Sequence, residues 1–186
     1  MPVVPTNEAE LRLEQQKIYW RSGAAFILCS ISLCTAHFLL PGIIDFPSDD
    51  LESRLVFLAA ANLLLVAWVI IGVRMVSNGR RGSAEDIVGS AYSRPSPNIA
   101  VASAFLQNTL EQFVIASVTL SALLILWGAP AMPFVSVSIL LFSIGRVSFL
   151  MGYPKGAGGR AFGMALTALP SVAAFLLSIG IIIVRL

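Results

Sequence analysis

Residues 146–163 read RVSFLMGYPKGAGGRAFG and combine three cationic side chains, a tyrosine and five glycines between two long apolar runs. On a helix, Arg146, Phe149 and Tyr153 fall near one face, because their spacing is i, i+3 and i+7. The proline and glycines that follow predict the end of that helix, and Arg160 is expected to open the next one. This stretch therefore predicts a cationic, hydrogen-bonding corner between two apolar helices.

A second polar cluster lies in the sequence FLQNTLEQF, residues 105–113. Glu111 is the one acidic residue inside the long apolar runs, and Asn108 precedes it by three residues on the same helical face. A carboxylate inside a bilayer costs about 2.5–3.5 kcal/mol unless it is paired or hydrated, so we expect Glu111 to meet a cation. Arg146 and Arg160 are the expected partners, which would bring an acid, an amide, a phenol and guanidinium groups together.

Two interpretations of this cluster are open. A structural ion pair would hold three helices together and would need one guanidinium group per carboxylate. The cluster instead has a surplus of arginine over acid, which favours a pocket for a small zwitterionic or anionic ligand. In such a pocket the carboxylate would bind an ammonium group, and the arginines would bind carboxylates or a thiolate. A proton path through Glu111 is disfavoured, because no acid lines the other half of the predicted spans.

The composition places these residues in an integral membrane protein. Of 186 residues, 57% are hydrophobic and 12% are charged, about half the charged fraction of a soluble protein. The net charge of +2 is too small and too scattered to indicate nucleic-acid binding. Cys29 and Cys34 lie in one apolar run and, five residues apart, point to different faces, so they are expected to pack and not to form a disulfide or a metal site.

Five apolar runs are each long enough to cross a bilayer once, which predicts an all-α membrane bundle. The runs are Ala24–Ile44, Leu55–Val73, Ile99–Trp127, Phe134–Met151 and Ala161–Val184. A short lead-in helix is expected before the first run, with Asn7 and Glu10 as a capping box and Tyr19 and Trp20 at the lipid interface. Pro170 predicts a kink in the last run, tolerable where a neighbouring helix binds the freed carbonyl.

The loop charges predict the orientation. The N-terminal segment, the 74–98 loop and the 146–160 corner are basic, whereas the 45–54 loop is acidic and the 128–133 turn is uncharged. Because cytoplasmic loops carry an excess of Lys and Arg, we expect the N-terminus and the polar corner in the cytoplasm and the C-terminus outside.

The motifs N-x-x-E (Asn108, Glu111) and R-x-x-(aromatic)-x-x-G-Y-x6-R (Arg146 to Arg160) resemble those of the MAPEG family, the membrane-associated proteins in eicosanoid and glutathione metabolism. The spacing from Tyr153 to Arg160 resembles the leukotriene-forming synthases of that family. The resemblance covers residues 54–186, a four-helix membrane domain. Residues 22–53 would then be an extra N-terminal transmembrane helix with its outer loop, and residues 1–21 a cytoplasmic amphipathic lead-in helix.

The resemblance implies a homotrimer that binds glutathione between subunits near the cytoplasmic face and acts on a lipophilic small molecule from the bilayer. Asn108 and Glu111 would hold the γ-glutamyl end, and Tyr153 would hydrogen-bond the tripeptide. Arg160 would face the sulfur and act as the catalytic group. Arg146 fits the motif as a binding or structural residue. The basic end of the second run, with Arg74, Arg80 and Arg81, would reach a glutathione carboxylate of the neighbouring subunit.

Three positions depart from this pattern. Ala104 stands where the leukotriene-forming enzyme has a ligand-binding arginine, and Phe149 and Gln112 replace ligand-contacting tyrosines. Two functions therefore remain open: a glutathione-dependent transferase or peroxidase, and a non-catalytic lipid-binding or complex-associated subunit of the same family.

Overall fold

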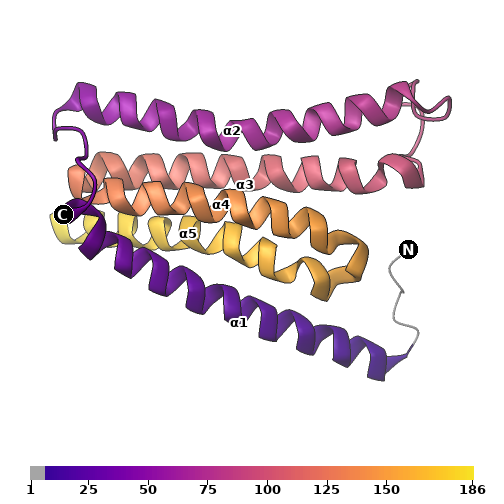
Figure 1. Cartoon of the computed structure of the whole chain (residues 1–186), viewed down its shortest axis with the longest axis horizontal. Coiled ribbons are helices and arrows are strands. Elements are labelled where there is room, and N and C mark those ends of the chain that lie inside the picture. The colour runs from indigo at the N-terminus through magenta and orange to yellow at the C-terminus, as the bar shows by residue number, and fades with distance from the viewer. Residues whose placement is uncertain (1–6) are drawn as a thin grey trace.

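The computed structural model describes residues 7–186, which form five α-helices and contain no strand. The helices are α1 (Glu8–Leu39), α2 (Leu51–Arg81), α3 (Pro97–Trp127), α4 (Met132–Gly152) and α5 (Gly156–Arg185). They lie side by side along one long axis. α1 starts at one end of the bundle and α5 finishes at the other (Figure 1). The all-α prediction is confirmed for the described residues.

Four stretches of this chain are long and apolar enough to cross a membrane: Glu8–Gly42, Leu51–Arg81, Pro97–Trp127 and Ala129–Arg185. The last stretch contains both α4 and α5, which fold back along each other (Figure 1). At about 1.5 Å per residue, the 21 residues of α4 span about 31 Å, close to the thickness of a bilayer core.

The predicted lead-in helix is not separate from the first apolar run. α1 continues through both, from Glu8 to Leu39, because Gly23 lowers helix propensity by only about 1 kcal/mol and no proline interrupts the segment. The predicted Asn7 cap is confirmed, since its Oδ1 accepts a hydrogen bond from the Glu10 amide at 2.9 Å. Residues 1–6 of the predicted 1–21 segment lie outside the described part of the chain.

α1 packs on α5 through a stripe of mostly small side chains, Ala25, Cys29, Leu33 and Ala36. The Cys29 thiol donates to the Leu166 carbonyl at 3.9 Å. Leu166 lies four residues before Pro170, so its carbonyl is the one that proline leaves without an amide donor. A neighbouring helix thus satisfies the carbonyl that Pro170 frees, as expected for a proline in a membrane helix.

Glycines bring α4 and α5 into backbone contact. A Cβ on Gly145 would lie 2.3 Å from the Thr167 hydroxyl oxygen, and one on Gly163 would lie 2.3 Å from the Phe149 nitrogen. Nearer the corner, a Cβ on Gly152 would lie 2.2 Å from the Gly159 carbonyl oxygen. Larger residues at these positions would force the two helices apart, so the glycines fix where α4 and α5 place their polar side chains.

The connection between these helices is shorter than the sequence predicted, because α5 begins before Arg160. α4 ends at Gly152, a 3-10 turn spans Tyr153–Lys155, and α5 begins at Gly156 with φ +83°, a conformation that favours glycine. Arg160 is therefore the fifth residue of α5 and not its opening residue. Its own backbone amide is therefore not one of the free amides at the helix start, because only the first four amides of an α-helix lack an intrahelical acceptor.

Charged loops lie at both ends of the bundle. The start of α1, the α2–α3 loop and the α4–α5 corner share one end, which we call the basic end (Figure 1). At the other end, Asp49 pairs with Arg54 at 2.8 Å and accepts a hydrogen bond from the Ala129 amide at 2.6 Å, which joins the α1–α2 loop to the α3–α4 turn. The segments predicted to share one side of the membrane thus share one end of the molecule.

The α2–α3 loop is ordered by Asp86. Its carboxylate accepts hydrogen bonds from the Ser96 amide at 2.9 Å and the Ser96 hydroxyl at 2.6 Å, and these bonds lower the pKa of Asp86. Ser96 is the N-cap residue of α3, so this contact fixes the start of that helix.

Candidate functional site

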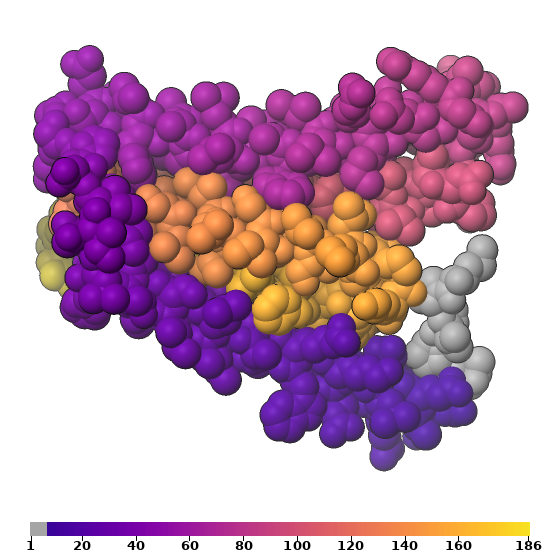
Figure 2. Space-filling view, viewed as in Figure 1, coloured from indigo at the N-terminus to yellow at the C-terminus, as the bar shows by residue number. Residues whose placement is uncertain are grey.

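A cleft of about 600 Å³ opens between α1, α3, α4 and α5 near the basic end. Four of its lining side chains are polar, namely Ser22, Asn108, Tyr153 and Arg160, and the rest are apolar or small. We call it the Arg160 cleft. In the space-filling view α1 covers one side of the α4–α5 pair and α2 the other (Figure 2). The structure therefore brings together three of the residues that the sequence predicted for the site: Asn108, Tyr153 and Arg160.

Arg146 lies behind the cleft and holds Asn108. Its side chain is 0% exposed, and one terminal nitrogen donates to the Asn108 Oδ1 at 2.8 Å. Its Nε donates to the Thr167 hydroxyl at 3.1 Å, and that hydroxyl donates to the Gly163 carbonyl at 2.8 Å. Because Arg146 takes the Asn108 oxygen, the amide NH₂ of Asn108 is the group left to donate to a ligand.

The Arg146 guanidinium group lies beside two aromatic rings and forms no ion pair with an acid of the described residues. Its guanidinium carbon lies 4.9 Å from the Phe149 ring centroid and 5.6 Å from that of Phe142. No carboxylate within the described residues pairs with it, and its second terminal nitrogen is buried without a hydrogen-bond partner. The predicted ion pair between this region and Glu111 is thus replaced by a buried cation bound to an amide, a hydroxyl and two rings.

Arg160 reaches the cleft from α5. Its guanidinium carbon lies 4.6 Å from the centroid of the Tyr153 ring, and the Tyr153 ring packs edge-on against Phe149 at 5.6 Å. Among the described residues, Arg160 also has no carboxylate within ion-pair distance. Arg160 thus lines the cleft and Arg146 lies behind it, and neither guanidinium group is paired with an acid of the described residues, an arrangement that favours an anionic group in the cleft.

Glu111 lies on a different face from the cleft. It is exposed on α3, and its carboxylate accepts a hydrogen bond from the Gln107 side chain at 2.9 Å. It forms no ion pair with any described residue of its own chain. The expectation that Glu111 meets a cation is therefore not fulfilled within one subunit, although Asn108, three residues earlier, points to the cleft.

Arg74, Arg80 and Arg81 lie in the last turns of α2, outside the residues that line the cleft. Arg74 and Arg81 are exposed and Arg80 is half-buried. Within one subunit these three arginines do not reach the Arg160 cleft. Their contact with a glutathione carboxylate of a neighbouring subunit stays a prediction.

α1 contributes to the site in a way that the sequence did not indicate. Ile18 and Ser22 form part of the cleft wall. Next to it, the Gly158 amide in the first turn of α5 donates to the Glu14 carboxylate at 3.1 Å. Glu14 thus caps one of the free amides at this helix start, and that amide is not available to a ligand. No spacing signal links Glu14 to Gly158, 144 residues away, so this contact required the structure.

Thr167 was also not predicted. It follows Gly163 by four residues and Arg160 by seven, so it shares their face of α5, and this helical spacing could have drawn attention to it.

Comparison with known proteins adds one finding. The sequence model of the MAPEG family matches residues 55–180, which include α3, α4 and nearly all of α2 and α5, but not α1. No curated protein and no solved structure matches the chain.

Proposed function

Because this chain belongs to the MAPEG family, we propose that it is a membrane-embedded, glutathione-dependent transferase or peroxidase that activates a thiolate against lipophilic electrophiles. The family match covers the part of the chain that carries Asn108, Tyr153 and Arg160 but not the α1 wall of the cleft, and the family consists of membrane proteins in eicosanoid and glutathione metabolism. The observation that carries the proposal is the pair of guanidinium groups, Arg146 and Arg160, that meet no carboxylate in the described chain.

In this proposal Arg160 is the catalytic residue. A guanidinium group beside the sulfur favours the thiolate over the thiol, whose proton leaves to solvent. The thiolate then bonds to the carbon of an aryl halide as halide leaves, or to the terminal oxygen of a hydroperoxide as the O–O bond breaks and an alcohol leaves, after which a second glutathione completes a disulfide and water is released. Tyr153 donates its hydroxyl to the tripeptide, and Asn108 donates its amide NH₂ to a ligand carboxylate. Arg146 acts through Asn108 as a positioning residue, because its hydrogen bond fixes which end of the amide faces the cleft.

The other predicted contacts need a second subunit. Glu111 would bind the ammonium group of the γ-glutamyl end, and Arg74, Arg80 and Arg81 would reach a glutathione carboxylate across a subunit boundary. Because Glu111 is exposed on α3, we propose that α3 faces its neighbours in a homotrimer. A monomer in mild detergent that still bound glutathione would contradict this assembly.

We further propose five membrane crossings, with α1 as an addition to the four helices of the family. The start of α1 and the basic end would lie in the cytoplasm and the end of α5 outside. The alternation of helix direction and the grouping of basic segments at one end support this orientation.

The direct test is titration of the purified protein with glutathione while the thiolate absorbance is followed in the ultraviolet. We expect a saturable thiolate signal at neutral pH, with turnover of a lipophilic aryl halide or an organic hydroperoxide. A protein that binds glutathione and shows neither signal would refute the enzyme assignment.

The second candidate is a non-catalytic lipid-binding or complex-associated subunit. The observation in its favour is that Ala104 and Phe149, which line the cleft, provide no polar group toward a ligand. Under this alternative the cleft would bind a lipophile without thiolate formation, and the same titration would give binding of the lipophile alone.

A further inference from the structure

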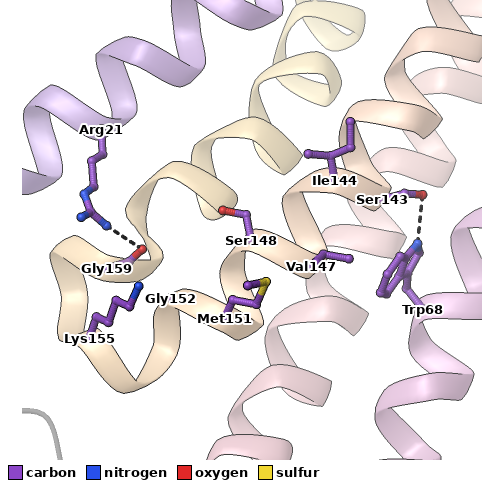
Figure 3. Close-up of a pocket in the computed structure, with 10 residues that line it drawn as sticks. All are labelled: Arg21, Trp68, Ser143, Ile144, Val147, Ser148, Met151, Gly152, Lys155 and Gly159. Atoms are coloured by element: carbon purple, nitrogen blue, oxygen red, sulfur yellow. Dashed lines mark hydrogen bonds between the residues drawn. The ribbon is translucent and has the colours of Figure 1, made fainter.

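A second cavity, of about 550 Å³, lies along α4 (Figure 3) and is lined by other residues of α4 than the Arg160 cleft. Val147 lines this cavity and Phe149 lines the Arg160 cleft; two residues apart on a helix, they point about 200° apart. We call this cavity the Lys155 groove. Its walls come from α1, α2, α4 and the α4–α5 corner, so it is separate from the site of the proposed thiol chemistry.

The groove is cationic at one end and apolar along its length. Arg21 and Lys155 lie together near Gly159, and Ile144, Val147 and Met151 line the part that leads away from them (Figure 3). At the far end the Trp68 indole nitrogen donates to the Ser143 hydroxyl at 3.0 Å. This is the shape of a site for an amphiphile whose charged head lies near Arg21 and whose chain follows α4.

Neither Arg21 nor Lys155 forms an ion pair with an acid of the described residues. One Arg21 nitrogen donates to the Gly159 carbonyl at 3.0 Å, which leaves the other N–H groups of this guanidinium free to donate. Lys155 takes part in none of the ion pairs of residues 7–186, and no residue that lines the groove is acidic. A phosphate oxygen suits both groups, since guanidinium and ammonium groups bind phosphate through charge-assisted hydrogen bonds.

Neighbouring aromatic residues give the depth of this cationic end. Tyr19 and Trp20 directly precede Arg21 on α1 and are 77% and 74% exposed. They lie just before the apolar run that begins at Ala24, and exposed Tyr and Trp at the boundary of an apolar run lie at the level of lipid headgroups. Arg21 and Lys155 are therefore at headgroup level, and the apolar part of the groove extends toward the hydrocarbon.

We propose that the Lys155 groove binds an anionic phospholipid of the adjoining leaflet, with its phosphate between Arg21 and Lys155 and one acyl chain along Val147 and Ile144. Basic pockets between membrane helices are a known means of binding anionic lipid headgroups. A zwitterionic lipid is a poorer ligand, because its own ammonium group meets two uncompensated cations. Since Arg21 belongs to α1, the bound lipid would also strengthen the contact between α1 and Gly159.

Native mass spectrometry of the full-length protein tests the proposal. The protein is released from detergent micelles that contain phosphatidylglycerol, phosphatidylcholine or glycerol phosphate alone. We expect one retained phosphatidylglycerol per chain, and little retention of phosphatidylcholine or of the headgroup without its chains. Equal retention of the two lipids, or retention of glycerol phosphate alone, would overturn the proposal.

Two variants locate the lipid. Lys155→Gln should weaken phosphatidylglycerol retention about fivefold, the usual contribution of one basic residue near a membrane surface. Arg12→Gln, on the exposed part of α1 and outside the groove, should change retention little if binding is local. An equal loss in both variants would show general surface attraction and would refute the site.

Val147→Trp places a large side chain in the apolar part and leaves every charge in place. It should abolish lipid retention, whereas Val56→Trp, at an exposed position of α2 outside the groove, should not. If Val147→Trp instead broke the oligomer and left phosphatidylglycerol bound, a second copy of the chain would occupy the groove and the proposal would be wrong. Thiolate formation, read on the same variants, is expected to persist, which separates this proposal from the function proposed above.

Discussion

Replacement of Arg160 by alanine is expected to remove the thiolate and to leave the bundle intact. The structure supports the second half of this prediction, because the Arg160 guanidinium contacts the Tyr153 ring and no carboxylate of the described chain. No ion pair is lost in Arg160→Ala, so the melting temperature should change little.

The magnitude follows from the charge of the guanidinium group. At about 4 Å and an effective dielectric constant of about 20, one unit charge stabilises a thiolate by about 4 kcal/mol, or about 3 pH units. Desolvation in the cleft opposes this effect, so we take a net decrease of about 2 units from a free thiol pKa near 8.5. Glutathione would then be about three-quarters thiolate at pH 7 in the wild type. In Arg160→Ala, where the opposing desolvation remains, the thiolate would be about 3% at most, a loss of at least about 25-fold.

The assay is the ultraviolet thiolate signal of bound glutathione as a function of pH, measured beside turnover. Arg160→Lys should restore part of the signal, because an ammonium group carries the charge without the planar fork. Arg94→Ala, an exposed cation in the α2–α3 loop, should behave as the wild type. If Arg160→Ala kept both the thiolate signal and turnover, Arg160 would have no catalytic role and the electrostatic argument would fail.

Four further outcomes are expected. Gly163→Ala should destabilise the bundle by about 1–3 kcal/mol, since its Cβ would lie 2.3 Å from the Phe149 nitrogen, whereas Gly180→Ala, with open space around it, should not lower the melting temperature. Arg146→Met should weaken glutathione binding about tenfold, because the hydrogen bond to Asn108 is lost. The free energy of unfolding should change little, because the substitution also removes a buried charge. A melting temperature that fell in step with the affinity would show that Arg146 is purely structural. Asp86→Asn should speed amide exchange in the 82–96 loop at neutral pH. Because the folded-state pKa of Asp86 is lowered, the stabilisation of the loop by its carboxylate is complete above a pH of about 3.9 and is lost as the pH falls through the folded-state value. Acid should therefore speed exchange in the wild type as the variant does at neutral pH. A reporter fused after Leu186 should lie outside the cytoplasm, and a cytoplasmic reporter would refute the proposed orientation.

The apolar runs predicted the helices well, because hydrophobic length is the dominant signal in a membrane protein. The run expected at Ile99–Trp127 is the helix Pro97–Trp127, and the uncharged turn after it is as short as expected. The error at Arg160 has a specific cause. Gly156, Gly158 and Gly159 predict a break in the helix, but Gly152 and Gly159 bring the α4 and α5 backbones into contact, and this packing offsets the low helix propensity of glycine.

The site was harder to predict than the helices. Motif spacing placed Asn108, Tyr153 and Arg160 in one cleft, because each lies at a fixed position on its helix. Motif spacing does not predict how one helix is rotated about its axis relative to its neighbours. That rotation decides where the Glu111 side chain points. Ser22 and Glu14 belong to α1, which is outside the family match, so no motif could associate them with the cleft.

The position of Glu111 links the site to the assembly. Glu111 lies near the middle of α3, fifteenth of 31 residues. It is exposed, and Gln107 is its one side-chain partner among residues 7–186. A carboxylate left against lipid at this depth costs about 2.5–3.5 kcal/mol, and a subunit interface around α3 would remove that cost. At the Arg160 cleft of the same subunit, Arg146 and Arg160 form no ion pair with an acid of the described residues, and Arg146 is fully buried. We infer that the acidic and cationic halves of the binding site belong to different subunits, so that a ligand with both an ammonium group and carboxylates would join them.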